Sequence, residues 1–118
     1  MHIPPKTPQR TWTVIVPPEP YGQEVLDVFR GLDDTLFDEL RATERVMEIT
    51  GPQAGHYCGR LADIGVKSYA VRLGAAAIHL VISVAPTEPG RIMLHGVVTG
   101  VLQTAAIKRL VRHHRDSG

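Results

Sequence analysis

The chain has 118 residues, 43% of them hydrophobic, which is enough to bury one core without help from metals or disulfides. Cys58 is the only cysteine, so an intramolecular disulfide is excluded and a reducing compartment is the natural setting. No apolar run approaches the roughly 20 residues of a membrane-spanning helix, and the start MHIPPKTPQR lacks the apolar segment of a signal peptide. We therefore expect a soluble, cytoplasmic protein with no membrane contact.

The net charge of +1 conceals an asymmetry between the two halves of the chain. Residues 1–59 contain five Lys/Arg and nine Asp/Glu, a net charge of −4, whereas residues 60–118 contain eight and three, a net charge of +5. Such a split indicates an acidic face and a separate basic face that suits a polyanion. The alternative is two solvated surfaces that merely differ in charge.

The first part of the chain predicts an arm, a strand and a helix. Residues 1–10 contain three prolines and no periodicity, so we expect a flexible arm ahead of a single domain over residues 11–118. Residues 11–16 are β-branched or aromatic and are followed by two prolines, which is the pattern of a short strand and a turn. Apolar side chains at i, i+3, i+4 and i+7 then predict a helix: Val25, Val28, Phe29 and Leu32.

A second helix is predicted from about residue 35 to residue 50. Asp33 or Asp34 can cap it, because a carboxylate oxygen accepts hydrogen bonds from the free N–H groups of the first turn. Gly51 and Pro52 end it, since glycine accepts a left-handed exit and proline cannot continue a helix. We expect residues 51–59 to form a loop.

The second half of the chain changes to a period of two. Strands are predicted over residues 68–73, 78–84 and 91–99, and Thr104 can cap a last helix whose exposed side is basic. Three consecutive strands with short connections form an antiparallel meander. The expected fold class is α+β, one small domain in the order β–α–α–β–β–β–α, with two N-terminal helices on one face of an antiparallel sheet and a C-terminal basic helix.

Three stretches of the second half resemble the RelE/HigB-like toxins of type II toxin–antitoxin systems, phage-derived relatives included. These stretches are YAVRL (residues 69–73), IHLVISV (78–84) and LHGVVTGVLQTAAIKRLVRHHRD (94–116). The similarity of topology extends over nearly the whole chain, and the similarity of residues begins at about Tyr69. The resemblance implies a RelE-like fold.

The resemblance also implies that the protein cleaves messenger RNA in the decoding site of the ribosome, without a metal or other cofactor. In that reaction the RNA 2′-hydroxyl attacks the adjacent phosphate, so the protein must supply a base, cations for the phosphoryl charge and an acid for the leaving oxygen. The implied partners are the ribosome, mRNA and a cognate antitoxin, which we expect to be a helix-turn-helix protein.

Three residues are the candidates for catalysis. Arg72 matches the family's strand arginine and is expected to hold the phosphate. His79 stands where the family has an arginine, and its imidazole can act as base or acid at neutral pH. His95 matches the family's strand histidine, although strand histidines are often packed and hydrogen-bonded. Further side chains are candidates for RNA binding: Arg60, Lys67, Lys108, Arg109, Arg112 and His113.

The chain departs from the family pattern at four positions. Thr99 and Gly100 stand where the family often has two lysines, and Ile78 and Val97 stand where many relatives have aromatic residues. With only 5% aromatic residues, few side chains are left for base stacking. The alternative interpretation is therefore a non-catalytic module with this fold and a degenerate active site, which binds a nucleic acid or a protein.

Other constellations in the sequence do not favour a different chemistry. His56 and Cys58 could meet the histidines at 113 and 114, but nothing has the paired spacing of a zinc ribbon or finger. Cys58 has no nucleophile signature around it and is expected to be a half-buried loop thiol. We expect no metal.

Overall fold

The computed structural model describes residues 11–61, 65–74, 77–85 and 90–115. The elements follow in the order β1 (Thr13–Ile15), α1 (Tyr21–Arg30), α2 (Asp34–Thr50), a short 3-10 helix (Gly51–Ala54), β2 (His56–Leu61), β3 (Val66–Arg72), β4 (Ile78–Val84), β5 (Arg91–Thr99) and α3 (Thr104–Arg115). The arm predicted over residues 1–10 lies outside the described residues. Within those described ranges, no helix is both long and apolar enough to span a bilayer.

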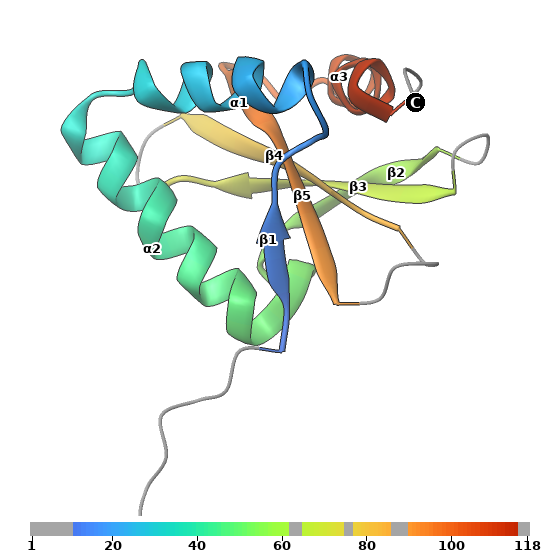
Figure 1. Ribbon diagram of the computed structural model, residues 1–118, viewed down its shortest axis with the longest axis horizontal. Helices are drawn as coiled ribbons and strands as arrows, with labels where there is room; N and C mark the ends of the chain where they lie inside the picture. Colours follow the sequence, from blue (N-terminus) through green and yellow to red (C-terminus); the bar gives the residue numbers. More distant parts are fainter. Residues whose placement is uncertain (1–10, 62–64, 75–76, 86–89, 116–118) are drawn as a thin grey trace, which may run out of the picture.

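One five-stranded sheet, in the order β1-β5-β4-β3-β2, forms the centre of the molecule (Figure 1). Neighbouring strands are antiparallel with one exception: β1, the first strand of the chain, pairs in parallel with β5, the last strand. Short connections make β3, β4 and β5 a meander, as the sequence predicted. The α+β fold class is confirmed, and the observed order contains one more strand than the prediction.

The additional strand is β2, in the segment that was predicted to be a loop. Its sequence HYCGRL shows no period-two alternation of apolar residues, and the register with β3 shifts between Tyr57 and Gly59. Gly59 has a φ of 136°, which residues with a Cβ rarely adopt. The Lys108 side chain lies against this glycine so closely that a Cβ would collide with it. The bulge disrupts the alternation by which the strand could have been recognised in the sequence.

Two hydrophobic cores lie on opposite faces of the sheet. The first combines α1 and α2 with one face: Val25, Phe29, Leu40, Met47, Val71, Leu73, Leu80, Ile82, Ile92 and Leu94. The second combines α3 with the other face: Cys58, Val66, Ala70, Val81, Ala85, Ile107 and Val111. The two N-terminal helices therefore cover one face, and the C-terminal helix covers the other.

The ends of α2 follow the sequence closely. The Asp33 side chain accepts a hydrogen bond from the backbone N–H of Leu36 at 2.8 Å, which caps the helix as predicted. Gly51 ends it with a φ of 72°. The Trp12 indole packs on that glycine, and a Cβ would come within 2.5 Å of Trp12 Cε2. Glycine is therefore required at position 51 for two reasons: its backbone conformation ends α2, and its lack of a side chain leaves room for the Trp12 indole.

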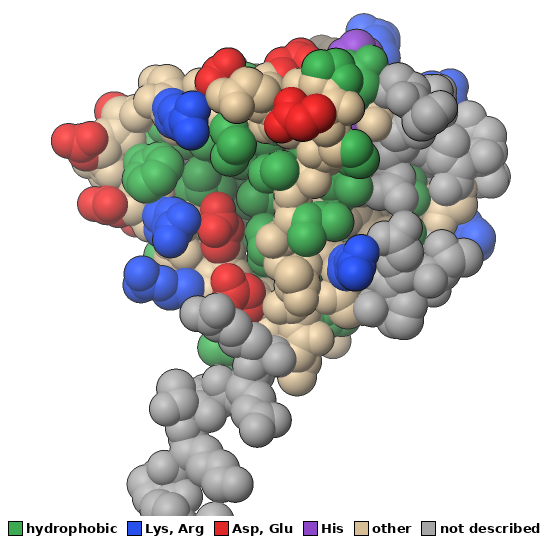
Figure 2. Space-filling model, viewed as in Figure 1, with side chains coloured by type: hydrophobic (Ala, Val, Ile, Leu, Met, Phe, Trp, Pro, Cys, Tyr) green, Lys and Arg blue, Asp and Glu red, His purple; other side chains and the backbone are tan. Residues whose placement is uncertain are grey.

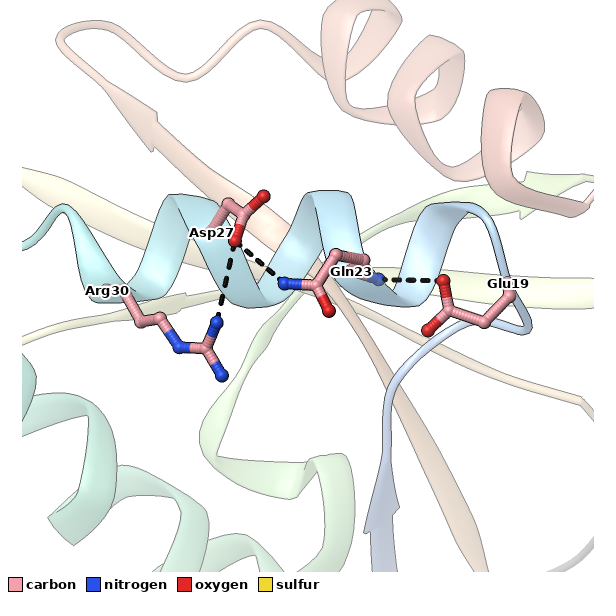
Figure 3. Close-up of polar contacts among 4 residues, drawn as sticks. All are labelled: Glu19, Gln23, Asp27 and Arg30. Atoms are coloured by element: carbon pink, nitrogen blue, oxygen red, sulfur yellow. Dashed lines mark hydrogen bonds and ion pairs between the residues drawn. The ribbon is translucent and has the colours of Figure 1, made fainter.

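A chain of polar contacts follows the exposed side of α1 (Figure 3). Glu19 Oε2 accepts a hydrogen bond from the backbone N–H of Gln23 at 3.4 Å, and Gln23 Nε2 donates to Asp27 Oδ1 at 2.9 Å. Arg30 Nη1 lies 3.6 Å from the same Asp27 oxygen. Because both side chains of this ion pair are largely exposed, solvent screens the attraction and the pair contributes little to stability. The buried side of the helix holds it in place.

A bulge in β5 explains the His-Gly pair in an otherwise apolar strand. Val81 of β4 pairs with Gly96 and Ile82 pairs with Leu94, so β5 contains one extra residue, His95. Gly96 has a φ of 141°, a backbone conformation that essentially only glycine adopts. The bulge places His95 on the same face of the sheet as α3.

Replacement of Gly96 by alanine should destabilise the fold through backbone strain, because a Cβ there has space but the φ angle is unfavourable. We expect a loss of about 1–3 kcal/mol in the free energy of unfolding, measured by urea denaturation. Gly100→Ala is the control, since its φ of 78° lies in the left-handed region and nothing surrounds its Cβ position. It should cost about 1 kcal/mol. Equal losses would show that the bulge does not require glycine.

Candidate functional site

Arg72 and His79 form a polar row at one end of the sheet. Arg72, the last residue of β3, pairs with His79 of β4, and His79 pairs with Val98 of β5. Both neighbours of Arg72 in the chain belong to the first core, so the Arg72 side chain lies on the opposite face, which α3 covers. Arg72 is exposed and His79 is half-buried. The structure thus brings together two of the three predicted catalytic residues.

A hollow of about 510 Å³ adjoins this row where β5 ends and α3 begins. Residues of both elements and of their connection line it: Val97, Val98, Thr99, Val101, Gln103, Ala106 and Ile107. Val98 lines the hollow and is the cross-strand partner of His79, so the hollow lies next to the polar row. Its volume is within the range of small-molecule sites, and its walls are polar and apolar in about equal parts. This hollow was not predicted, because residues 99–103 have no motif.

The Nδ1 atom of His79 is buried and makes no hydrogen bond with any described residue. A buried polar atom without a partner costs on the order of 1–3 kcal/mol, so such atoms are uncommon in folded proteins and need an explanation. This ring nitrogen is not held by the protein around it. This nitrogen is therefore a polar group of the row that no described residue satisfies.

His95 is enclosed in the interior. It is only 2% exposed, its Nε2 lies 2.7 Å from Ser83 Oγ, and its Nδ1 lies 2.8 Å from His114 Nδ1. Both ring nitrogens therefore have partners within the protein, which agrees with the packed role considered for strand histidines. His114, at 5% exposed, belongs to the same buried group, although the sequence showed it only as part of a basic helix end.

The six predicted RNA-binding residues divide between the two faces of the sheet. Arg109, Arg112 and His113 are exposed on α3, and Lys108 is half-buried on the same helix. Arg60 and Lys67 form a cross-strand pair and are exposed.

The position of the Arg60–Lys67 pair follows from the alternation of β3. Lys67 alternates with Val66 and Ser68, and Val66 packs in the second core, so the pair lies on the face opposite α3. The structure therefore does not bring this pair to the polar row.

A second hollow, of about 490 Å³, lies between α1, α2 and β1. It is lined by Val14, Ile15, Val16, Leu26, Phe29, Arg41, Glu44 and Leu94. Figure 2 shows hydrophobic side chains gathered between the two helices, with acidic and basic side chains around them. Burial raises the pKa of the Glu44 carboxyl, an effect that Arg41 opposes and Glu48 reinforces. This apolar groove was not predicted either, since the sequence alone does not show how far apart the two helices lie.

No cluster in the described part of the chain has the composition of a metal centre. No three His, Cys, Asp or Glu side chains come together there as ligands. Cys58 lies on β2 rather than in a loop and is buried at 8% exposed. Burial raises the pKa of its thiol, and a backbone hydrogen bond with Ala70 and the charge of Lys108 oppose this only in part.

The fold is similar to that of a solved structure. No protein-family model matches the chain, and no curated protein matches it. Among solved structures, it is similar to the crystal structure of an archaeal RelE–RelB complex from Pyrococcus horikoshii OT3, with a TM-score of 0.59 and 13% sequence identity. The match covers 75% of this chain and 94% of the archaeal chain. The chain therefore has a RelE-like fold.

The Cys58 thiol should react slowly in the folded protein, because it is buried and the thiolate is the reactive form. We expect the reaction with a disulfide reagent such as DTNB at pH 7.5 to be slower than that of the urea-unfolded chain by about 100-fold or more. The two rates are measured from the absorbance of the released thiolate. Similar rates in the two states would show that the thiol is accessible and would reopen its role as a nucleophile.

Proposed function

We propose that the protein is the toxin of a type II toxin–antitoxin system and a cytoplasmic endoribonuclease that cleaves mRNA on the ribosome. The observation that supports this most directly is the Arg72–His79 row, on the α3 side of a RelE-like sheet and beside an open hollow. Neither side chain is needed for a hydrophobic core. Both are of the types that RNA cleavage without a metal requires.

In the proposed reaction, the imidazole of His79 takes the proton of an RNA 2′-hydroxyl. The 2′-oxygen then bonds to the adjacent phosphorus, and the bond from phosphorus to the 5′-oxygen breaks. The products are a 2′,3′-cyclic phosphate and a 5′-hydroxyl, whose proton comes from water or from an imidazolium. Arg72 stabilises the phosphoryl oxygens as their charge increases. The exposed cations of α3, Arg109 and Arg112, attract the rest of the strand.

The proposed function requires an antitoxin, as RelE has RelB in the archaeal complex. The groove between α1, α2 and β1 is a suitable place for part of such a partner, because it is apolar and lies on the acidic half of the chain. Phosphate groups would be repelled there, whereas an amphipathic protein segment would bury its apolar side. We expect the partner to be a helix-turn-helix protein.

A second candidate function is a non-catalytic binding module with the same fold. The end of β5 favours it, since Thr99 and Gly100 supply no cation beside the hollow and none of the residues that line the hollow is basic. Such a module would bind RNA or a protein without cleaving it. The two functions differ in one measurable respect, which is whether RNA is broken.

Expression of the protein alone should stop growth and produce cleaved mRNA, and Arg72→Ala should abolish both effects. Removal of one group that stabilises developing negative charge in a transition state typically costs about 10²–10³ in rate. The measurements are growth after induction and primer extension on a reporter mRNA. Arg30→Ala is the matched control, because Arg30 is an exposed arginine on α1. Equal toxicity of the two variants would refute the role of Arg72, and RNA binding without cleavage by the parent would favour the binding module.

RNA affinity should fall steeply with added salt, and only one face of the sheet should contribute to this dependence. Arg109→Gln should lower the slope of log affinity against log salt by about 0.7–0.9, the value for one phosphate contact. Lys67→Gln, on the opposite face, should leave the slope unchanged. The slopes are measured by fluorescence anisotropy with a labelled single-stranded RNA. Equal effects of the two substitutions would show that RNA contacts both faces.

A further inference from the structure

A pair of buried histidines connects β5 to the last turn of α3. The rings of His95 and His114 are nearly parallel, with an interplanar angle of 9° and centroids 5.0 Å apart, and their Nδ1 atoms are 2.8 Å apart. His95 is 2% exposed and His114 is 5% exposed. The contact therefore joins the C-terminal helix to the middle of the sheet through a single hydrogen bond between two titratable rings.

The number of protons on the pair decides whether this contact can exist. A hydrogen bond between two Nδ1 atoms needs one proton, so one ring donates and the other accepts through its lone pair. The hydroxyl of Ser83 satisfies Nε2 of His95 in either tautomer, because a hydroxyl both donates and accepts. If both rings are protonated, two N–H groups and two positive charges face each other at 2.8 Å in a buried site, and the contact is repulsive.

We propose that His95 and His114 form a proton-dependent clamp that positions α3 on the sheet, and that protonation of both rings releases the C-terminal end of the helix. The clamp does not depend on the proposed RNA chemistry. Its target is the helix that carries Arg109, Arg112 and His113. Release would move these cations relative to the row formed by Arg72 and His79.

The surroundings of the clamp favour the neutral pair at neutral pH. Burial lowers the pKa of His114, the charge of His113 beside it lowers the pKa further, and Glu24 of α1 opposes both effects. The Tyr21 ring of α1 packs on His113 and His114, with centroid distances of 4.8 and 5.5 Å. Ser83 of β4 faces the pair with its hydroxyl. Among the charged neighbours, the Glu24 carboxylate opposes the neutral pair.

The direction of the pH dependence follows from the lowered pKa. When the helix end is free, His114 has the ordinary histidine pKa of 6.5. When the end is docked, the pKa of His114 is lower. The docked state is therefore fully stable above pH 6.5 and loses stability as the pH falls below that value. Each proton taken up on release increases the release equilibrium constant by up to about tenfold per pH unit. The last turn can open without the rest of the fold, because helix ends are among the least stable parts of a protein.

The test is backbone hydrogen exchange of the full chain at pH 7.5 and pH 5.0, expressed as protection factors so that the intrinsic pH effect is removed. Amides of the last two turns of α3 should lose about tenfold or more of their protection at pH 5.0. Amides of β4 should keep theirs. Unchanged protection in α3 at pH 5.0 would overturn the proposal.

Two variants separate the clamp from a general loss of stability in acid. His114→Gln removes one of the two titratable rings, so the helix end should be less protected at pH 7.5 and should respond less to pH than in the parent. His113→Gln is the matched control, since it removes a neighbouring imidazole and keeps both rings of the pair. Because the charge of His113 lowers the pKa of His114, the pH response should remain and should move to a somewhat higher pH. The same pH response in both variants would overturn the proposal.

A direct measurement on the parent protein keeps the proposal testable if His114→Gln does not fold. The ¹⁵N shifts of the ring nitrogens distinguish neutral imidazole from imidazolium. At pH 6.0 at least one ring of the pair should be neutral in the folded protein, because the contact needs an unprotonated Nδ1. Both rings should be largely protonated in urea at the same pH. Imidazolium signals from both rings in the folded state, with α3 still protected, would exclude the clamp.

Discussion

The structure depends on the burial of β4 and β5 on both faces. Leu80, Val81 and Ile82 are consecutive residues of β4, and each is 0% exposed. Because successive side chains point to opposite faces, such a run must be covered by α1 and α2 on one side and by α3 on the other. Each large side chain buried in this way stabilises the fold by about 1.5–3 kcal/mol. Apolar residues therefore fill the middle of the sheet, and polar groups there must be paired.

This constraint determines where function can reside. In the middle of the sheet, His95 and Ser83 are fully enclosed and satisfy each other together with His114. At the end of the sheet, where β3 stops and β4 starts, Arg72 is exposed and His79 is half-buried, and the hollow beside α3 lies next to them. The same face of the sheet thus carries a closed polar cluster that positions a helix and, at its end, a polar row whose arginine is exposed.

The sequence predicted the parts of the fold that depend on local patterns. The two N-terminal helices, the Asp33 cap, the exit at Gly51 and the β3–β4–β5 meander are confirmed, because each follows from periodicity or from the chemistry of a single residue. The strand β2 was missed because its register shift and Gly59 disrupt the alternation. The RelE-like fold inferred from three stretches is confirmed by the structural similarity.

The site was less predictable, because it depends on contacts between distant residues. That Arg72 and His79 lie side by side follows from the hairpin and was within reach of the sequence. The partnership of His95 with His114 was not, since it requires both the bulge in β5 and the crossing of α3 over the sheet. The sequence also did not show that the basic residues lie on two faces of the sheet, because the placement of Lys67 and Arg60 opposite α3 depends on the position of that helix.

The distribution of charge and apolar surface has a consequence for inhibition under the proposed function. The apolar groove lies on the face that α1 and α2 cover, whereas the Arg72–His79 row lies on the face of α3. A partner that only filled the groove would leave the row open. An antitoxin that blocks RNA must therefore extend around the edge of the sheet and place negative charge near α3, or it must displace that helix. Displacement of α3 would break the contact between His95 and His114. The free energy of that contact would therefore reduce the affinity of an antitoxin that acts in this way.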